Sequence, residues 1–233
     1  WTKDLRTYLF SRAGIGTASR VLEVGCGTGA IISNLKTPAI VHGLDLKPVC
    51  LLEACRHAPQ ANLNCGDAMS LPFAAGVFDI TFCHFLLLWV RDPLQALREM
   101  KRVTRPAGSI LALAEPDYNS RVDKPDVLAP LSRWQAESLQ RQGADPGLGM
   151  RLARLFHQSG ISLIETGRLR ADKGFSPAPG DRDLEWAVLE SDLEGLVSAE
   201  EILRLKNLDE RAWERGQRVL NVPTYWAFGI PGR

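Results

Sequence analysis

The first half of the chain shows short apolar runs that alternate with stretches in which apolar residues recur three and four positions apart. The first pattern predicts buried strands, and the second predicts helices that cover them. The expected strands are 20–24, 40–45, 62–66, 78–84 and 109–114, and the expected helices are 1–14, 30–35, 47–58 and about 93–103. A regular alternation of strand and helix predicts a parallel sheet with helices on both faces and right-handed crossovers.

The pattern changes after Glu115, where proline-containing loops and longer helices replace the short alternation. The expected elements are a loop at 116–130, helices at 130–142 and 150–159, a strand at 162–170, a loop at 172–183, helices near 183–196 and 198–217, and a last strand near 224–229. The last two strands are thus far apart in sequence. We interpret the chain as a single domain, 1–233, with an N-terminal helix, 1–14, and helical insertions at 118–149 and 172–220.

Composition is that of an ordinary globular protein, with 45% hydrophobic and 24% charged residues. The 28 Lys and Arg residues nearly balance the 27 Asp and Glu residues, so we expect no broad basic face and no nucleic-acid partner. No apolar run reaches the roughly 18 residues of a membrane span. The longest candidate, 82–90, is interrupted by His84 and is followed by Arg91. We therefore expect no membrane partner and no secretory signal, and a start at Trp1 is consistent with further residues before it.

Five cysteines, at 26, 50, 55, 65 and 83, form no C-x-x-C pair. Their odd number and loose spacing favour reduced thiols, and hence a cytoplasmic location. The four histidines, at 42, 57, 84 and 157, are dispersed along the chain. We therefore expect no bound metal.

The segment VLEVGCGTG, residues 21–29, joins an apolar strand directly to a glycine loop and a helix. Glycines let the chain turn sharply and approach a ligand closely, and the following helix start presents unpaired N–H groups. This pattern predicts a cofactor site, but it does not identify the cofactor. Gly25, Gly27 and Ala30 also match the dinucleotide pattern G-x-G-x-x-A, and Asp45 has the position of a ribose-binding acid in either kind of enzyme. A turn that binds nothing is the third interpretation.

Downstream motifs favour one cofactor over the other. Gly66-Asp67-Ala68 follows the third strand, Leu71-Pro72-Phe73 comes next, Phe78-Asp79 opens the fourth strand, and Arg105-Pro106-Ala107-Gly108 precedes the fifth. With this ordered set, residues 20–116 resemble the class I S-adenosylmethionine-dependent methyltransferases. They look closest to the small-molecule methyltransferases of ubiquinone and menaquinone biosynthesis. The match is looser afterwards, although GADPGLGMRLARLFHQSGI, residues 143–161, looks like a segment of such enzymes.

The resemblance implies a Rossmann-like α/β fold: a seven-stranded, mostly parallel sheet with an antiparallel last strand in a three-layer αβα arrangement. It also implies S-adenosyl-L-methionine as cofactor and S-adenosyl-L-homocysteine as product. Glu23, Gly25, Cys26, Gly27 and Gly29 would line the methionine and ribose part, Asp45 would bind the ribose hydroxyls and Leu46 would pack on adenine. Asp67, with Ala68 and Met69 beside it, would accept from the adenine amino group. His84 would lie at the end of the fourth strand, where the chain passes the cofactor.

Each acidic residue also has a purely structural interpretation. Asp45 has the position of a helix cap, and Asp67 that of a turn residue. Asp79 opens a strand away from the expected site, so we expect a structural role for it. Leu88 stands where many relatives carry a histidine before the tryptophan, which puts in doubt any mechanism borrowed from those relatives.

Methyl transfer from a sulfonium is an in-line displacement in which the protein mainly positions the acceptor and excludes water. His84 is the leading candidate for a catalytic base, with a hydrogen-bonded wall residue as the alternative. Glu115, Asp117 and Tyr118 follow the fifth strand, where open α/β sheets bind ligands, and we expect them either to touch the acceptor or to form a solvated turn.

The helices after residue 130 and the N-terminal helix are expected to form a lid over the acceptor, with apolar walls from Trp1, Trp134, Trp186 and Trp213. The alternative is that each tryptophan packs helices onto the sheet. We expect a small-molecule acceptor and a monomer or homodimer. The competing functions are an NAD-type oxidoreductase, a non-catalytic S-adenosylmethionine-binding module and an RNA or protein methyltransferase.

Overall fold

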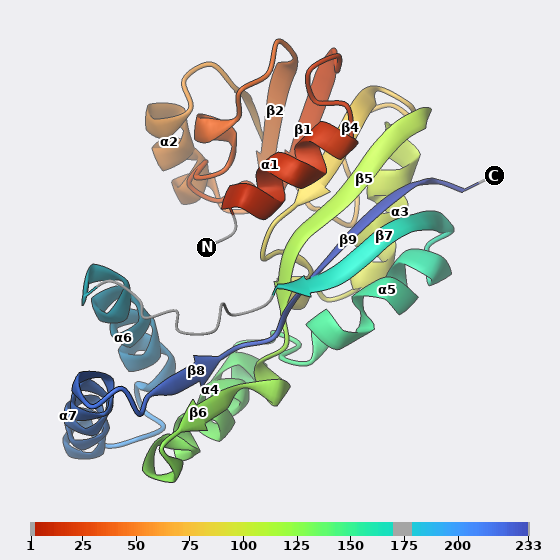
Figure 1. The fold of residues 1–233 in the computed structure, drawn as a ribbon. Helices are drawn as coiled ribbons and strands as arrows, with labels where there is room; N and C mark the ends of the chain where they lie inside the picture. The colour runs from red at the N-terminus through yellow and green to blue at the C-terminus, as the bar shows by residue number, and fades with distance from the viewer. Residues whose placement is uncertain (1–2, 170–178, 233) are drawn as a thin grey trace.

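A computed structural model describes residues 3–169 and 179–232 of the chain. Its main sheet has seven strands in the order β3-β2-β1-β4-β5-β9-β7 (Figure 1). These strands are β1 Arg20–Val24, β2 Ile40–Asp45, β3 Asn62–Cys65, β4 Phe78–Cys83, β5 Thr104–Pro116, β7 Ile161–Leu169 and β9 Thr224–Pro231. The first five pair in parallel, whereas β9 runs antiparallel to both β5 and β7. The predicted seven-stranded Rossmann-like fold with an antiparallel last strand is thus confirmed.

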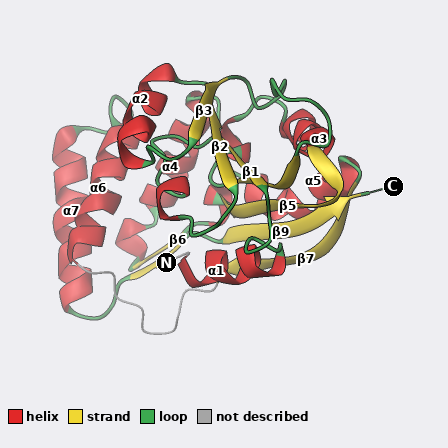
Figure 2. Ribbon diagram, turned by 90° about the horizontal axis from the view of Figure 1, so that it is seen from above, coloured by secondary structure: helices red, strands yellow, loops and turns green. Residues whose placement is uncertain are grey.

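Helices cover both faces of this sheet. The helices of the chain are α1 Lys3–Arg12, α2 Pro48–His57, α3 Pro93–Val103, α4 Pro130–Arg141, α5 Leu148–Gln158, α6 Pro179–Leu193 and α7 Ala199–Glu214. Leu22 of β1 packs in the apolar cluster that contains residues of α3 and α5, whereas its neighbour Val21 packs in the cluster that contains residues of α1 and α2. Successive strand residues point to opposite faces, so two separate cores form the three layers (Figure 2).

Helix α3 shows how the local sequence sets an element. Asp92 caps it by accepting a hydrogen bond from the Gln95 amide (2.9 Å), and Pro93 occupies the first helical position. Its buried residues, Ala96, Leu97, Met100 and Val103, recur at helical spacing and face the sheet. The predicted boundaries of about 93–103 agree with the observed ones because both the cap and the periodicity lie within the helix itself.

The expected helix at 30–35 is wrong, because the segment forms only a short 3-10 turn, Ile32–Asn34. Gly29 has a φ of +81°, outside the helical range, and therefore interrupts the backbone just before this segment. Pro38 precedes β2 and removes a backbone donor on the other side. A full helix does not fit between these two residues.

The loop expected at 116–130 contains the short strand β6, Val122–Lys124. It pairs antiparallel with β8, Val219–Asn221, which the sequence pattern also did not predict. Both strands are only three residues long, and each depends on a partner that is far away in sequence. The loop expected at 172–183 is helical from residue 179 onward, because α6 begins there; residues 170–178, including the expected end of the sixth strand, lie outside the described residues.

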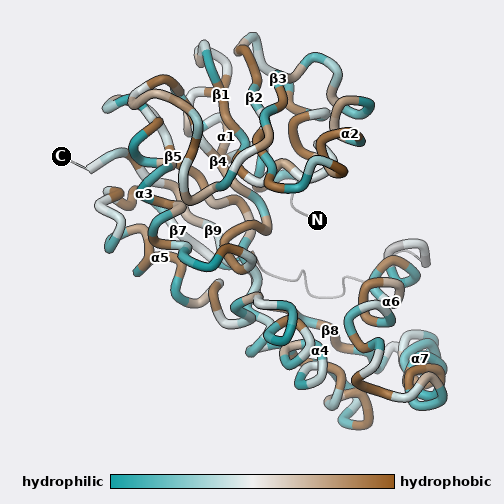
Figure 3. Tube along the Cα trace, turned by 180° about the vertical axis from the view of Figure 1, so that it is seen from behind, coloured by the Kyte–Doolittle hydropathy of each residue, from teal (hydrophilic) through white to brown (hydrophobic). Residues whose placement is uncertain are grey.

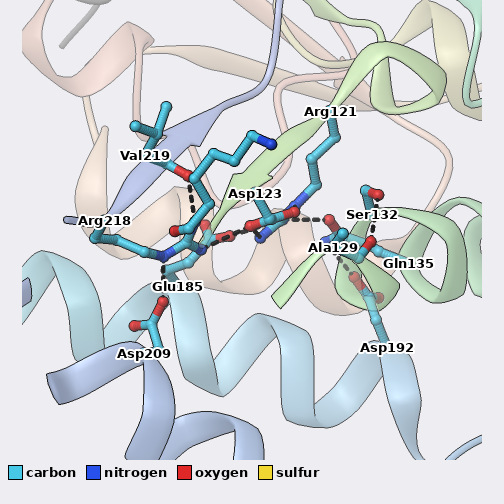
Figure 4. A network of polar contacts seen from close by, with 11 residues as sticks. Arg121, Asp123, Ala129, Ser132, Gln135, Glu185, Asp192, Asp209, Arg218 and Val219 are labelled. Carbon is cyan, nitrogen blue, oxygen red and sulfur yellow. Dashed lines mark hydrogen bonds and ion pairs between the residues drawn. The ribbon is translucent and has the colours of Figure 1, made fainter. Parts of the chain in front are cut away.

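Strands β6 and β8 and helices α4, α6 and α7 form a lobe of their own beyond the carboxyl edge of the sheet, whereas α5 and β7 lie with the sheet itself (Figures 1 and 3). Helices α6 and α7 contribute most of its apolar cluster, which includes Trp186, Leu189 and Leu205. Helix α4 joins the lobe to the sheet, since Leu131 packs in the lobe cluster and Leu139 packs in a sheet cluster. The lobe also contains a buried polar network around Arg121, Asp123, Asp209 and Arg218 (Figure 4).

Within residues 3–169 and 179–232, no helix combines the length and the apolar character needed to cross a bilayer.

Candidate functional site

A cavity of about 710 Å³ lies at the carboxyl ends of β1, β2 and β4. Nine of the predicted cofactor residues line it: Glu23, Gly25, Cys26, Gly27, Asp45, Leu46, Asp67, Ala68 and His84. Their positions span more than sixty residues of sequence, and the parallel sheet brings them to one edge. A separate hollow of about 920 Å³ near Lys101, Thr104 and Pro231 contains none of them.

Two predicted residues do not line the cavity. Gly29 instead packs closely against α2, where a side-chain carbon would lie 3.3 Å from Ala54 Cα. Met69 packs against the main core, and its amide donates to Asp67 Oδ1 (2.8 Å). Their roles in the structure are to close the glycine turn and the turn after β3.

The glycine loop forms the floor of the cavity. Gly25, Gly27 and Gly29 have φ angles of +73°, +51° and +81°, a region that favours glycine. The amides of Gly25 and Cys26 donate to Leu44 O at 2.7 and 2.9 Å, which fixes the loop to the end of β2. A side-chain carbon on Gly25 would lie 2.5 Å from Leu86 Cδ1. Glycine at position 25 therefore meets both a backbone and a packing requirement.

Asp45, the last residue of β2, connects two parts of the cavity wall. Its Oδ2 accepts from the Gly27 amide (2.8 Å) and its Oδ1 accepts from the Lys47 amide (2.9 Å). The alternative prediction that Asp45 caps α2 is therefore wrong, because Lys47 is the cap residue and makes no side-chain cap bond. Asp45 instead closes the turn before α2. The carboxylate supports the glycine loop and still faces the cavity.

The other two acidic residues have structural contacts as expected. Asp67 forms a turn, with its carbonyl accepting from the Ser70 amide (3.0 Å), and it also lines the cavity. Asp79 accepts from the amides of Ser19 and Arg20, both at 2.7 Å, and pairs with Arg105 at the opposite edge of the sheet. The structural role expected for Asp79 is confirmed.

Two buried polar atoms in the cavity wall have no hydrogen-bond partner among the described residues: Glu23 Oε2 and His84 Nε2. Burial raises the pKa of Glu23 well above its usual range. Burial, with a smaller contribution from Arg6, lowers the pKa of His84 to about 4. An unpaired buried polar atom is costly, so both atoms are suited to a ligand that supplies a partner.

The sulfur in the glycine loop is not an activated nucleophile. Burial raises the pKa of Cys26 to about 12, so its thiol stays protonated at neutral pH. Within the described residues, no three His, Cys, Asp or Glu side chains converge on a possible metal position. His57 instead lies behind the loop, with Nδ1 2.9 Å from Thr28 O.

The end of β5 and the segment after it do not form the expected solvated turn. Glu115 and Asp117 are buried, so the solvated turn is wrong, and neither they nor Tyr118 line the cavity. Asp117 accepts from Ser120 Oγ (2.7 Å). Glu115 accepts from the amides of Leu86 and Leu87, both at 3.1 Å, and burial raises its pKa to about 7 although these bonds lower it.

The pH dependence of stability should show the titration of Glu115. Its pKa of about 7 in the folded chain exceeds the usual 4.5, so between these values the folded state holds a proton that the unfolded state releases. The carboxyl thus favours folding most below pH about 4.5, and this contribution falls by about 3 kcal/mol as the pH rises to about 7. Glutamine does not titrate. Urea titrations give the unfolding free energies of the wild type and of Glu115→Gln. The wild-type value minus the variant value should fall as the pH rises across this window, and a constant difference would contradict the raised pKa of Glu115.

The motifs do not indicate the cavity wall that follows β4. Phe85, Leu86, Trp89 and Val90 line the cavity from the segment after β4, and Gln142 lines it from the end of α4. The apolar run 82–90 was a visible signal for the first four, but nothing local in the sequence indicates Gln142. Leu88, the residue that departs from the family pattern, is buried in the main core and does not line the cavity.

The tryptophans of the lobe pack its helices against one another. Trp186 is buried and donates from Nε1 to Asp209 Oδ2 (2.9 Å), Trp134 packs on the same cluster, and the Trp213 ring lies 5.8 Å from the Arg182 guanidinium. None of these three lines the cavity, and Trp1 lies outside the described residues. In the described structure these three tryptophans pack helices, as in the alternative interpretation, but they pack the helices of the lobe and not helices onto the sheet. The N-terminal helix packs on the sheet, where the ring centroids of Phe10 and Phe82 are 5.0 Å apart.

Comparisons with known proteins agree with this geometry. A family model described as "Methyltransferase domain" matches residues 22–112. O-methyltransferase rstn1 of Aspergillus nomiae is 31% identical over 183 residues, covering 75% of this chain and 78% of that protein. A malonyl-[acyl-carrier protein] O-methyltransferase of Halorhodospira halophila is 37% identical over 98 residues, covering 40% of this chain and only 33% of that protein.

A solved structure extends the agreement to the whole fold. It belongs to a Bacillus halodurans protein described as a methyltransferase, and it superposes with a TM-score of 0.67 at 15% identity, over 97% of this chain and 98% of that one. At this identity the superposition concerns the fold alone, whereas the sequence match to the Aspergillus nomiae enzyme concerns the family. The chain belongs to the class I S-adenosylmethionine-dependent methyltransferases.

Proposed function

We propose that this chain transfers the methyl group of S-adenosylmethionine to a small organic acceptor, with S-adenosylhomocysteine as product. The observation that carries the proposal is the cavity at the carboxyl ends of β1, β2 and β4, where two unpaired buried polar atoms lie near exposed apolar side chains. Leu46 and Trp89, which line this cavity, are 65% and 46% exposed. A ligand with a polar end and an aromatic base matches both features.

The residues present fit this cofactor. Glu23, next to the glycine loop, would hold the methionine part, because a buried acid without a partner suits an ammonium group. Asp45 would accept from the ribose hydroxyls. Leu46 would pack on the adenine ring, and Asp67, with Ala68 beside it, would accept from the adenine amino group.

The cofactor supplies an already activated methyl group, so the chain's task is to position the acceptor and exclude water. Leu86, Trp89 and Val90 form an apolar wall that suits a small organic molecule. We propose hydroxyl or carboxyl acceptors for the first trials, because both relatives described above are named O-methyltransferases.

We also propose that the lobe made by the insertions 118–149 and 172–220 covers the acceptor. Gln142 at the end of α4 already lines the cavity, and the lobe extends beyond the same edge of the sheet (Figure 1). The near balance of basic and acidic residues argues against a nucleic-acid acceptor. Five free cysteines favour a cytoplasmic location, and we propose a monomer or homodimer.

Calorimetry with two ligands tests the cofactor assignment. We expect S-adenosylhomocysteine to bind with a 1:1 stoichiometry and NAD⁺ to give no heat. Tight NAD⁺ binding without S-adenosylhomocysteine binding would overturn the proposal in favour of an oxidoreductase. Stoichiometric cofactor binding with no turnover on any acceptor library would instead favour a non-catalytic module, and salt-sensitive RNA binding would favour an RNA methyltransferase.

His84 is proposed as the catalytic base, and its replacement separates this role from that of a wall residue. A pKa of about 4 keeps the imidazole neutral at physiological pH, as a base requires, although it also makes that base weak. We expect His84→Ala to lower kcat about a hundredfold while changing S-adenosylhomocysteine affinity much less. His42→Ala is the matched control, because His42 also has a buried unpaired Nδ1 but packs on Phe73 and Phe78 outside the cavity. Unchanged kcat in His84→Ala would remove the base role.

A further inference from the structure

Glu115, near the end of β5, reaches from its strand into the turn that follows β4. Its side chain is fully buried. Oε1 accepts from the amides of Leu86 and Leu87, both at 3.1 Å, and Oε2 accepts from the amide of Leu88 at 3.4 Å. One carboxylate therefore satisfies three consecutive backbone donors in a place that water does not reach.

The turn that receives this carboxylate has an unusual backbone. Phe85 has a φ of +53°, the only positive value at a non-glycine residue in the described part of the chain. This left-handed conformation points the next three amides in one direction, toward Glu115. The Phe85 amide itself donates to Ala114 O (2.9 Å), so β5 holds the turn through backbone and side chain together. Such a conformation at a bulky residue persists only when its surroundings hold it in place.

The same turn forms one wall of the cofactor cavity. His84, Phe85, Leu86, Trp89 and Val90 all line the cavity, whereas Glu115 does not. Leu86 lies against the glycine loop so closely that a side-chain carbon on Gly25 would overlap it. A small movement of the turn would therefore change both the space above Gly25 and the apolar wall.

The turn is also connected to the lobe. The carbonyl of Leu88 accepts from the amide of Asp145 (2.7 Å), which lies in the segment between α4 and α5. Gln142, which follows α4 and lies three residues before Asp145, lines the cavity. The position of the turn thus affects where the lobe is attached as well as the shape of the cavity.

We infer that Glu115 is a positioning residue for methyl transfer, which holds the turn 85–90 in the shape that the cofactor and acceptor require. It acts through the backbone of Leu86, Leu87 and Leu88 and does not touch the ligands. This inference rests on the proposed function, because it assigns the turn to the wall of the cofactor cavity. It differs from a general role in folding, since its expected effect is on ligand affinity.

Asp79 provides a matched control at the other end of the same sheet. It too is a buried carboxylate that accepts from consecutive backbone amides, those of Ser19 and Arg20. It lies away from the cavity. Glu115→Gln and Asp79→Asn therefore make the same chemical change to carboxylates that accept from backbone amides. Asp79 additionally loses its ion pair with Arg105, and only the change at Glu115 concerns the cavity wall.

The experiment measures S-adenosylhomocysteine affinity by calorimetry at pH 8, where the Glu115 carboxyl is mostly ionised. We expect Glu115→Gln to raise Kd about tenfold, because the amide group brings a donor toward backbone donors and the turn relaxes. We expect Asp79→Asn to change Kd less than twofold, even where it lowers the melting temperature equally. An equal effect of both variants on Kd would overturn the inference. Absence of binding to the wild type would overturn the proposed function itself.

Hydrogen exchange gives a second measurement that needs neither ligand nor a stable variant. A second titratable side chain, that of Cys83 from β4, contacts Glu115, with its Sγ 3.8 Å from Oε1. Burial raises the pKa of this thiol, so the thiol does not titrate in the pH range of the experiment. Protonation of Glu115 near pH 7 should weaken its bonds to the turn. In the wild type, protection of the Leu86, Leu87 and Leu88 amides, corrected for intrinsic rates, should fall between pH 8 and pH 6. Constant protection in that range would contradict the positioning role.

Discussion

Replacing Asp45 by alanine is expected to weaken S-adenosylhomocysteine binding by about two orders of magnitude. Two effects combine. The proposed bonds to the ribose hydroxyls disappear, and hydrogen bonds to a charged acceptor are stronger than neutral ones. In addition, the Gly27 amide loses its partner Oδ2 and the Lys47 amide loses Oδ1, so the glycine loop is held to the end of β2 less firmly, by the bonds to Leu44 O.

Calorimetric titration at neutral pH measures this loss, and two further variants show where it arises. Asp45→Asn keeps one acceptor oxygen and should give an intermediate affinity. Asp92→Ala removes an exposed aspartate that also accepts from a backbone amide, that of Gln95, but lies at the start of α3 outside the cavity. It should bind S-adenosylhomocysteine as the wild type does. An affinity of Asp45→Ala within twofold of the wild type would remove Asp45 from the cofactor site.

The central sheet could be predicted from sequence because the necessary information is local. Apolar runs such as 78–84 are buried on both faces, and the capped periodicity of 93–103 defines a helix without reference to distant residues. The errors occur where the outcome depends on tertiary contacts. Strand β6 exists only because β8, almost a hundred residues later, pairs with it. The turn Ile32–Asn34 reflects how the glycine loop leaves Gly29.

The candidate site divides in the same way. Glu23, Asp45 and Asp67 stand in contiguous motifs at the ends of strands, so their meeting at one edge follows from the parallel topology. Gln142 reaches the cavity through the packing of α4, which no motif encodes. The sequence places Glu115 near the end of the fifth strand, but the role of this residue depends on a turn thirty residues earlier in the chain. The sequence therefore predicts the part of the cavity formed by the glycine loop and the ends of β2 and β3 much better than the part formed after β4 and by Gln142.

The lobe shows this limit most clearly. Its helices were predicted from periodicity, whereas the buried polar network that joins them was not (Figure 4). Asp123 is the centre of this network. Its Oδ2 accepts from Arg121 Nε (2.8 Å), and its Oδ1 accepts from Arg121 Nη2 (3.1 Å) and from Arg218 Nη2 (2.6 Å). One carboxylate thus joins β6 to the guanidinium that precedes β8.

We expect Asp123→Ala to lower the free energy of unfolding by about 3–5 kcal/mol, because it leaves two buried guanidiniums short of a counter-charge. Arg121 would keep Gln135 and Glu185, and Arg218 would keep Asp209, so the loss is large without removing every partner. Urea titration followed by tryptophan fluorescence measures it well, because Trp134, Trp186 and Trp213 all lie in the lobe.

Asp126→Ala is the control from the same segment. Its carboxylate pairs with Lys124 at 2.5 Å, but its side chain is 85% exposed, so solvent already screens the pair and we expect a much smaller loss than for Asp123→Ala. If Asp123→Ala were no more destabilising than Asp126→Ala, the apolar cluster around Trp186 and Leu205 would have to hold the lobe by itself. The buried charges would then serve to fix the pairing of β6 with β8, a role that hydrogen exchange at Val122 and Lys124 would reveal even with stability unchanged.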